Sequence, residues 1–456
     1  MAAWAMVTRN SRKGRLLLAS LCLLSSLAIA QQDRALTARL DEIREVVRFV
    51  PPKAIESLLQ IEQQARAADL RTRGEFLFQF SQARGNTGDV PAALLLADEL
   101  LKLGHDNKDN DLIAHGLLAR SYCAFRLNDQ KGSHILAWEA EKMAASSTSI
   151  PLKIRVTIAS ADSYSEEGNF PAALQKLQTA VQLARQSGQP IQQAMAFNSL
   201  AVLYWHMKEY GKGFEAFAEA TVAAEKINSP GRLSLLKSTE YALSIENNQP
   251  ERGLRALLAG LAYQRQIGAE AMIASSLVNL SDSYLKQKNY RKALEYATQA
   301  GETARRIKNE SAEATARINT GEAYLGMGKL VEGKRHVEAG LPFYEKSGDK
   351  VEMQKLMLEY GAYLERAGDT AGAIKDYHRE RKLSSELFEK RRQKATWELQ
   401  EKYEAEKRER RIELLSRENL IKSTEIENRR LQQRVWWLLV FVFGLVTAGL
   451  CGLTGS

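Results

Sequence analysis

Apolar residues recur at steps of three and four along most of the chain, which is the spacing of one face of an α-helix. Residues 271–307 show this pattern clearly. A first apolar stripe consists of Ile273, Leu277, Leu280 and Tyr284. The pattern breaks at Lys288 and Asn289, and a second stripe follows at Ala293, Leu294, Ala297 and Ala300. The segment predicts two helices joined by a short turn, and the small alanines allow the helices to approach closely.

This two-helix unit recurs with a period of about 40 residues. Residues 88–94 (GDVPAAL) match residues 168–174 (GNFPAAL), two periods later. Other copies are recognised by single residues that recur at the same position of the 40-residue period, among them Tyr164, Tyr204, Tyr284 and Tyr324. About eight units fit between positions 40 and 385. Because one helix pair cannot bury its apolar face alone whereas stacked pairs can, the repeat predicts an all-α solenoid.

The repeated residues resemble the tetratricopeptide repeat family. One unit matches the family's pattern with Leu200, Ala201, Tyr204, Tyr210, Phe217 and Ala220. Another matches it with Tyr164, Gly168, Phe170, Ala173 and Ala180. The resemblance covers positions 40–385 and implies a tetratricopeptide-type stack, although the period is longer than the family's usual length of roughly 34 residues. The unit at 231–270 also departs, with Ser244 and Pro250 where a tyrosine and an aromatic residue belong.

The two ends of the chain are more apolar than its body. Residues 1–30 combine a basic start with an uncharged run that ends in small residues, which predicts a signal peptide cleaved between Ala30 and Gln31. Residues 435–453 contain no charge and are long enough to span a bilayer, so we expect one transmembrane helix there. Residues 454–456 follow that span.

A charged linker connects the repeats (residues 31–385) to the predicted span. Residues 373–443 contain neither glycine nor proline, which favours one continuous helix. Within 386–434, basic and acidic residues are mixed, and no single heptad register holds the sparse apolar positions. A solvated single helix and a weak parallel coiled coil both fit; we favour a homodimer, which the small residues Gly444, Ala448 and Gly452 would assist.

The net charge of +9 does not point to nucleic acid. The excess lies in residues 1–30 and 390–434, so the repeats are neutral overall and we expect no nucleic-acid partner. Three cysteines are too few for a disulfide scaffold, and we interpret Cys123 as a small buried residue.

Catalytic and metal-binding signatures are not evident. The six histidines never occur as HxxxH or HExxH, which gives no indication of a zinc site. Ser234 and Lys237 have the spacing of a nucleophile and base, but such pairs are common on helix surfaces. We therefore expect no cofactor, no metal and no enzymatic activity in this chain.

The family resemblance implies a binding groove, because the first helix of each tetratricopeptide pair usually faces the concave side. By phase with Tyr204, Tyr284 and Tyr324, the inward-facing residues would be Asn198, Val202, Trp205, Asp282 and Glu322. A peptide or protein ligand is the expected partner of these residues.

The order of segments resembles the sensory half of bacterial membrane-bound diguanylate cyclases and of some histidine kinases. This resemblance implies a periplasmic sensory module, anchored in the inner membrane by one span, that relays ligand binding through residues 386–434. In those proteins a catalytic domain follows the span, whereas this sequence contains no GGDEF run or phospho-acceptor histidine box. The alternative is a membrane-tethered scaffold or assembly factor for envelope proteins.

Overall fold

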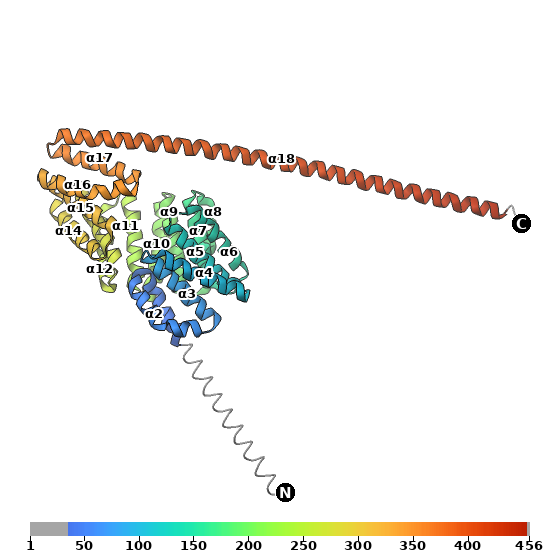
Figure 1. Cartoon of the computed structure of the whole chain (residues 1–456), viewed down its shortest axis with the longest axis horizontal. Helices are drawn as coiled ribbons and strands as arrows, with labels where there is room; N and C mark the ends of the chain where they lie inside the picture. The colour runs from blue at the N-terminus through green and yellow to red at the C-terminus, as the bar shows by residue number, and fades with distance from the viewer. Residues whose placement is uncertain (1–34, 454–456) are drawn as a thin grey trace, which may run out of the picture. The chain divides into compact units, whose positions relative to one another are not determined.

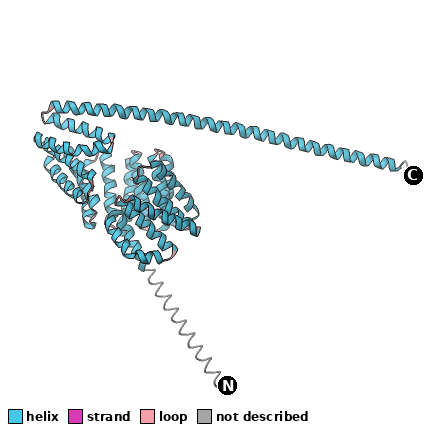
Figure 2. Cartoon of the chain, viewed as in Figure 1, coloured by secondary structure: helices cyan, strands magenta, loops and turns pink. Residues whose placement is uncertain are grey.

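The computed structural model describes residues 35–453, excepting the side chains of 398, 401, 402, 443 and 445–453. The predicted signal peptide, with its cleavage site between Ala30 and Gln31, lies outside the described residues, as do residues 454–456. Throughout the described range the chain is helical apart from short turns (Figure 2). The all-α prediction is therefore confirmed.

The chain begins with a helix at residues 35–49, which we call the 35–49 helix, followed by α2 (Pro51–Ala67). The helices that open each repeat are α3 (Leu70–Asn86), α5 (Asn110–Arg126), α7 (Ile150–Glu166), α9 (Pro190–His206), α11 (Pro230–Glu246), α13 (Glu270–Lys286), α15 (Glu310–Gly326) and α17 (Lys350–Arg366). Each is followed by its partner: α4 (Val90–Asn107), α6 (Gln130–Met143), α8 (Phe170–Ser187), α10 (Tyr210–Ile227), α12 (Pro250–Ile267), α14 (Tyr290–Arg306), α16 (Leu330–Ser347) and α18 (Thr370–Leu453).

A new helix begins at every twentieth position from α3 to α18, so that one helix pair fills each period of the sequence. The turns between α3 and α18, except the one before α7, share one backbone feature, a residue with positive φ two positions before the next helix. Glycine supplies it at about half of these turns, among them Gly88, Gly168 and Gly268, whereas lysine or asparagine supplies it at the others, as at Lys288 (φ 59°) and Asn228 (φ 51°). A residue in this conformation ends a helix by satisfying its last carbonyls. The turn predicted at Lys288 and Asn289 is thus confirmed.

The helices of residues 70–346 form two layers. Each opening helix packs against its partner, and opening helices also contact each other along the chain, as α3 does α5, α7 does α9 and α13 does α15 (Figure 1). The opening helices from α3 to α11 therefore form one continuous layer, and α13 and α15 adjoin each other in the same way. Ala293 and Ala300, predicted to let two helices approach closely, are fully buried.

The irregular unit at residues 231–270 keeps the same geometry. Ser244 is fully buried, and its hydroxyl donates to the carbonyl of Glu240 at 2.6 Å, so the smaller residue leaves no unpaired polar group. Pro250 is the first residue of α12, where its missing N–H costs nothing. Helices α11 and α12 pack together as the other pairs do.

The chain divides into two compact units, of which the second comprises residues 347–365 and 370–456. In this unit α17 contacts the start of α18, where Gln354 donates to Glu380 at 2.8 Å and Lys350 pairs with Glu386 at 2.6 Å. Helix α18 then continues without a break for 84 residues in all. The continuous helix predicted over 373–443 is confirmed, but it begins earlier, as the second helix of the last pair.

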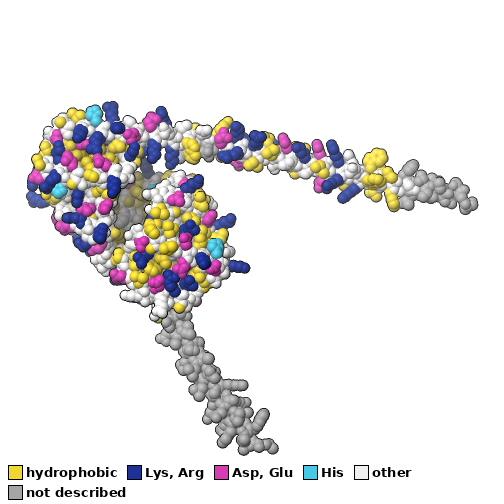
Figure 3. All heavy atoms as spheres, viewed as in Figure 1, with side chains coloured by type: hydrophobic (Ala, Val, Ile, Leu, Met, Phe, Trp, Pro, Cys, Tyr) yellow, Lys and Arg dark blue, Asp and Glu magenta, His cyan; other side chains and the backbone are white. Residues whose placement is uncertain are grey.

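Beyond residue 387 every described side chain of α18 is exposed. Figure 3 shows basic and acidic side chains mixed along this helix, with hydrophobic side chains gathered near its described end. Residues 435–442 are all apolar and more than half exposed. Over the residues that the structure describes, no helix is both long and apolar enough to cross a membrane. The side chains of 443 and 445–453, about half of the predicted span, lie outside that range.

Candidate functional site

A cavity of about 560 Å³ lies on the layer of opening helices. Helices α3, α5, α7, α9 and α11 each contribute side chains to its wall, and the 35–49 helix contributes the remainder. Successive opening helices present equivalent positions, because Arg155, Met195 and Leu235 share one phase of the repeat and all line the cavity. The repeat thus places five consecutive helices around one space.

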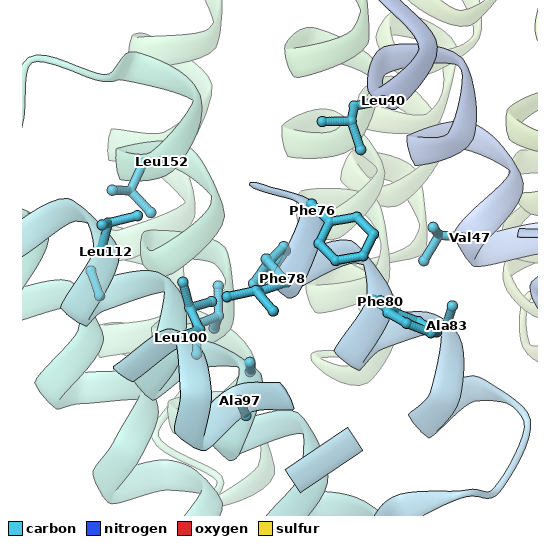
Figure 4. Packing of buried hydrophobic residues seen from close by; sticks show 14 of the residues in the cluster. Leu40, Val47, Phe76, Phe78, Phe80, Ala83, Ala97, Leu100, Leu112 and Leu152 are labelled. Atoms are coloured by element: carbon cyan, nitrogen blue, oxygen red, sulfur yellow. The ribbon is translucent and has the colours of Figure 1, made fainter. Parts of the chain in front are cut away.

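The 35–49 helix packs along α3. Its apolar face contributes Leu36, Leu40, Ile43 and Val47 to the largest buried cluster of the chain's described part. Figure 4 shows Leu40 and Val47 beside Phe76 and Phe80 of α3. Two side-chain amides of α3 donate hydrogen bonds to backbone carbonyls of this helix: Gln79 donates to Leu40 and Asn86 donates to Val47, both at 3.0 Å.

The same helix also reaches α11, which lies far along the chain. The Arg232 guanidinium donates from Nε to both Glu45 oxygens at 2.9 and 3.1 Å, and from Nη2 to Oε1 at 2.6 Å. The Ser229 hydroxyl donates to the same carboxylate at 3.2 Å. Phe49 packs over Gly231, where a β-carbon would lie 2.3 Å from its ring. The 35–49 helix therefore bridges the first and fifth opening helices.

Most of the charge in the cavity is positive. Five arginines line it (Arg44, Arg48, Arg126, Arg155 and Arg232), against the three acids Glu45, Glu75 and Asp162. Arg44 pairs with Glu75 at 3.0 Å and Arg232 pairs with Glu45. The other three arginines make no ion pair with any described residue.

Aromatic side chains lie among these charges. The Arg155 guanidinium stands over the Phe78 ring at 4.7 Å, and Phe78 meets His115 edge to face at 5.1 Å. Tyr122 and Phe125 line the same cavity, and Phe125 is half exposed. Stacked aromatic and guanidinium groups are suited to holding a peptide chain.

Burial shifts the protonation of three groups here. Burial raises the pKa of Asp162 to about 7, aided by the nearby Glu166 carboxylate and opposed by Arg48. Burial, with the charge of Arg155, lowers the pKa of His115 to about 4. Burial acts to raise the pKa of Glu75 as well, but the charges of Arg155 and Arg44 hold it at about 2. Near neutral pH, Glu75 is ionised, His115 is neutral and Asp162 is about half protonated.

The residues predicted to face the groove are not brought together. Asn198 lines the cavity and accepts a hydrogen bond from Thr239 at 2.9 Å. Val202 is half-buried on the same helix, and Trp205 packs against His206 with ring centres 4.6 Å apart. Asp282 pairs with Lys286 of its own helix at 2.7 Å.

Glu322 is 5% exposed on α15. Neither it nor Asp282 lines the cavity, which lies on earlier helices.

The lining residues that the sequence prediction missed carry the same repeat phase. Tyr122 and Asp162 precede Val202 by two repeats and by one repeat, and Phe125 precedes Trp205 by two repeats. The signal that selects Val202 and Trp205 therefore also selects Tyr122, Asp162 and Phe125 when it is applied to earlier repeats.

Other candidates from the sequence lie elsewhere. Ser234 is fully buried, and the Lys237 ammonium pairs with Glu240 at 2.8 Å. Cys123 is buried as expected, and burial raises the pKa of its thiol. Across the part of the chain that the structure describes, no cluster of three or more histidine, cysteine or acidic side chains could hold a metal ion.

Comparison with known proteins identifies the class of fold. No family model matches the sequence, and no curated protein matches it. The fold is similar to that of a Rap protein complexed with competence and sporulation factor, with a TM-score of 0.54 and 13% sequence identity. The similarity covers 78% of this chain and 99% of that chain.

Two further solved structures are similar. The Rap conjugation regulator of plasmid pLS20 with the Phr* peptide has a TM-score of 0.50 at 12% identity, over 78% of this chain and 96% of that chain. A signal transduction ATPase with a tetratricopeptide repeat sensor from Pyrococcus horikoshii has a TM-score of 0.51 at 14% identity, over 75% of this chain and 53% of that chain. At these identities the likeness shows the fold alone, a tetratricopeptide-type helical repeat.

Proposed function

We propose that this chain is a regulatory binding module whose cavity takes a peptide or an extended segment of a partner protein. The observation that carries the proposal is the cavity itself, lined by five successive opening helices with aromatic side chains and arginines. The similar Rap structures hold competence and sporulation factor in one case and the Phr* peptide in the other, which favours a peptide ligand.

We further propose that the module is exported and held at the bacterial inner membrane. The signal peptide predicted at 1–30 and the span predicted at 435–453 support this placement. Ligand binding would alter the packing of the repeats, and residues 386–434 would pass the change toward the membrane. Like the cyclase and kinase sensors that its segment order resembles, the chain would act on an output domain without catalysing a reaction itself.

Peptide panning on the full-length chain in lipid nanodiscs tests the proposal. Ser199 lines the cavity from α9, so Ser199→Trp should fill part of it and weaken peptide binding at least tenfold. Leu95 is 73% exposed on α4, away from the cavity lining, and Leu95→Trp is the matched control that should bind as the parent does.

Two outcomes would count against the proposal. Equal peptide affinity for Ser199→Trp and the parent chain would place binding outside the cavity. Stoichiometric co-purification of an envelope protein that Ser199→Trp leaves unchanged would favour the scaffold alternative instead.

A further inference from the structure

The charges in the cavity do not balance within the described chain. With Arg44 paired to Glu75 and Arg232 paired to Glu45, three arginines remain against one acid. Of these, Arg126 donates only to neutral oxygens, the carbonyl of Tyr122 at 3.0 Å and the amide of Asn86. Its charge therefore has no counter-ion among the described residues.

Arg155 has a buried donor that no described residue accepts. Its Nη1 is buried and has no hydrogen-bond partner within residues 35–453. The face of its guanidinium is covered by the Phe78 ring at 4.7 Å, which leaves the edge of the group for an acceptor. A buried guanidinium N–H without an acceptor is destabilising, so an acceptor supplied by a ligand would remove that cost.

Asp162 compensates this positive charge poorly. Burial and the Glu166 carboxylate disfavour its ionised form, so that it carries only part of a negative charge near neutral pH. It forms no ion pair with a described residue. Arg48 also lines the cavity, and the positive charge of Arg232 acts on it in addition.

One arginine of the cavity wall already binds a carboxylate. The carboxylate of Glu45 enters the cavity wall from the 35–49 helix, and the fork of Arg232 and the Ser229 hydroxyl hold it. The anion that this wall is shown to accommodate is thus a planar carboxylate, which an arginine fork matches in shape.

We propose that the cavity is a carboxylate site, in which Arg48, Arg126 and Arg155 take an acidic group of the bound peptide. The ligand is accordingly an acidic peptide, with its carboxylate supplied either by an aspartate or glutamate side chain or by the C-terminus. This inference rests on the proposed function and names the chemistry of its ligand.

A positional-scanning hexapeptide library, prepared as free acids and as C-terminal amides, tests it on the full-length chain. We expect aspartate or glutamate to be enriched at one or more positions, or binding to require the free acid. Loss of binding on amidation identifies the C-terminus as the source, whereas acidic enrichment that survives amidation identifies a side chain. Arg155→Gln should weaken binding of the selected peptide by about tenfold or more. Raising the salt concentration should weaken binding of the same peptide to the parent chain.

Two further variants keep the test decisive. Arg48→Gln alters a side chain that no described residue pairs with, so it should fold even if Arg155→Gln does not, and it should also weaken binding. Arg120→Gln is the matched control, because Arg120 lies on α5 outside the cavity lining and pairs with Asp98.

The outcomes separate this inference from the proposed function. Peptides that bind without any acidic preference, or that bind Arg48→Gln and Arg155→Gln as tightly as the parent, overturn the carboxylate site and leave the peptide-binding role intact. Selection of a nucleotide or other phosphate compound over every peptide, or retention of no peptide at all, overturns both.

Discussion

Removing the negative charge of Glu45 should release the 35–49 helix. Glu45→Gln keeps the size of the side chain but deprives Arg232 of its counter-ion, and the Arg232 side chain is only 11% exposed. Breaking a fully buried ion pair costs about 3–5 kcal/mol, and an exposed pair contributes about 0–1 kcal/mol. Glu45 is 27% exposed and glutamine can still accept a hydrogen bond, so we expect a loss of about 1.5 kcal/mol.

Native-state hydrogen exchange measures this loss where it acts. The 35–49 helix buries Leu36, Leu40, Ile43 and Val47, so its amides exchange only when the helix opens. A loss of about 1.5 kcal/mol corresponds to roughly a tenfold increase in opening, and hence in exchange rate. Amides of α13 and α14, which are distant in sequence, should keep their rates.

Glu42→Gln is the matched control for this experiment. Glu42 lies on the same helix but pairs with Arg39 of that helix, and both side chains are about half exposed or more. Such a pair contributes about 0–1 kcal/mol, so exchange should change by less than about fivefold. Equal exchange rates for Glu45→Gln and the parent, or an equal rise for both variants, would refute the account of the bridge to α11.

Three further predictions concern pH and backbone geometry. Because its pKa is about 7 in the folded state, above the value near 3.9 of an unfolded chain, Asp162 should make the protein lose stability as the pH rises from about 4 to about 7; thermal unfolding across this range should show a smaller loss for Asp162→Asn. Gly321→Ala should cost about 1–3 kcal/mol in denaturant unfolding, since its β-carbon would lie 2.6 Å from the Gly333 carbonyl oxygen, whereas Gly211→Ala, with no atom within 4 Å, should be neutral or stabilising. Lys288→Gly should stabilise by about 0.5–1 kcal/mol because the lysine holds φ at 59°, and a fall in the denaturation midpoint would contradict this.

Local features of the fold could be predicted from the sequence because they repeat. The alanines at helix contacts and the turn at Lys288 recur at fixed phase, and local steric and hydrogen-bonding preferences decide them. The start of the long helix was harder to place. Helix α18 opens at Thr370 as an ordinary repeat helix, and no breaker separates that part from the charged part after it.

The position within the repeat predicts which residues can line a cavity, but it does not predict where along the chain the cavity lies. Repeat phase indicates which face of each opening helix is turned inward, and it applies equally to Tyr122, Asp162 and Val202. The 35–49 helix and its contact with α11 determine which repeats enclose the cavity. That contact joins Glu45 to Arg232, which are 187 positions apart in the sequence. No periodic pattern encodes that contact, because Glu45 lies before α3, where the regular twenty-residue spacing of the helices begins.

The unbroken course of α18 has a mechanical consequence. Its first turns are fixed to α17, where Tyr377 donates to Glu365 at 2.8 Å and closes over Gly361, while the remainder carries no loop or hinge residue up to Gly444. At about 1.5 Å per residue the helix is about 126 Å long, so a tilt of about 1° at its base would displace the far end by about 2 Å. Helix α18 is therefore a lever arm, and sub-ångström adjustments at the α17 contact become movements of atomic size at its other end.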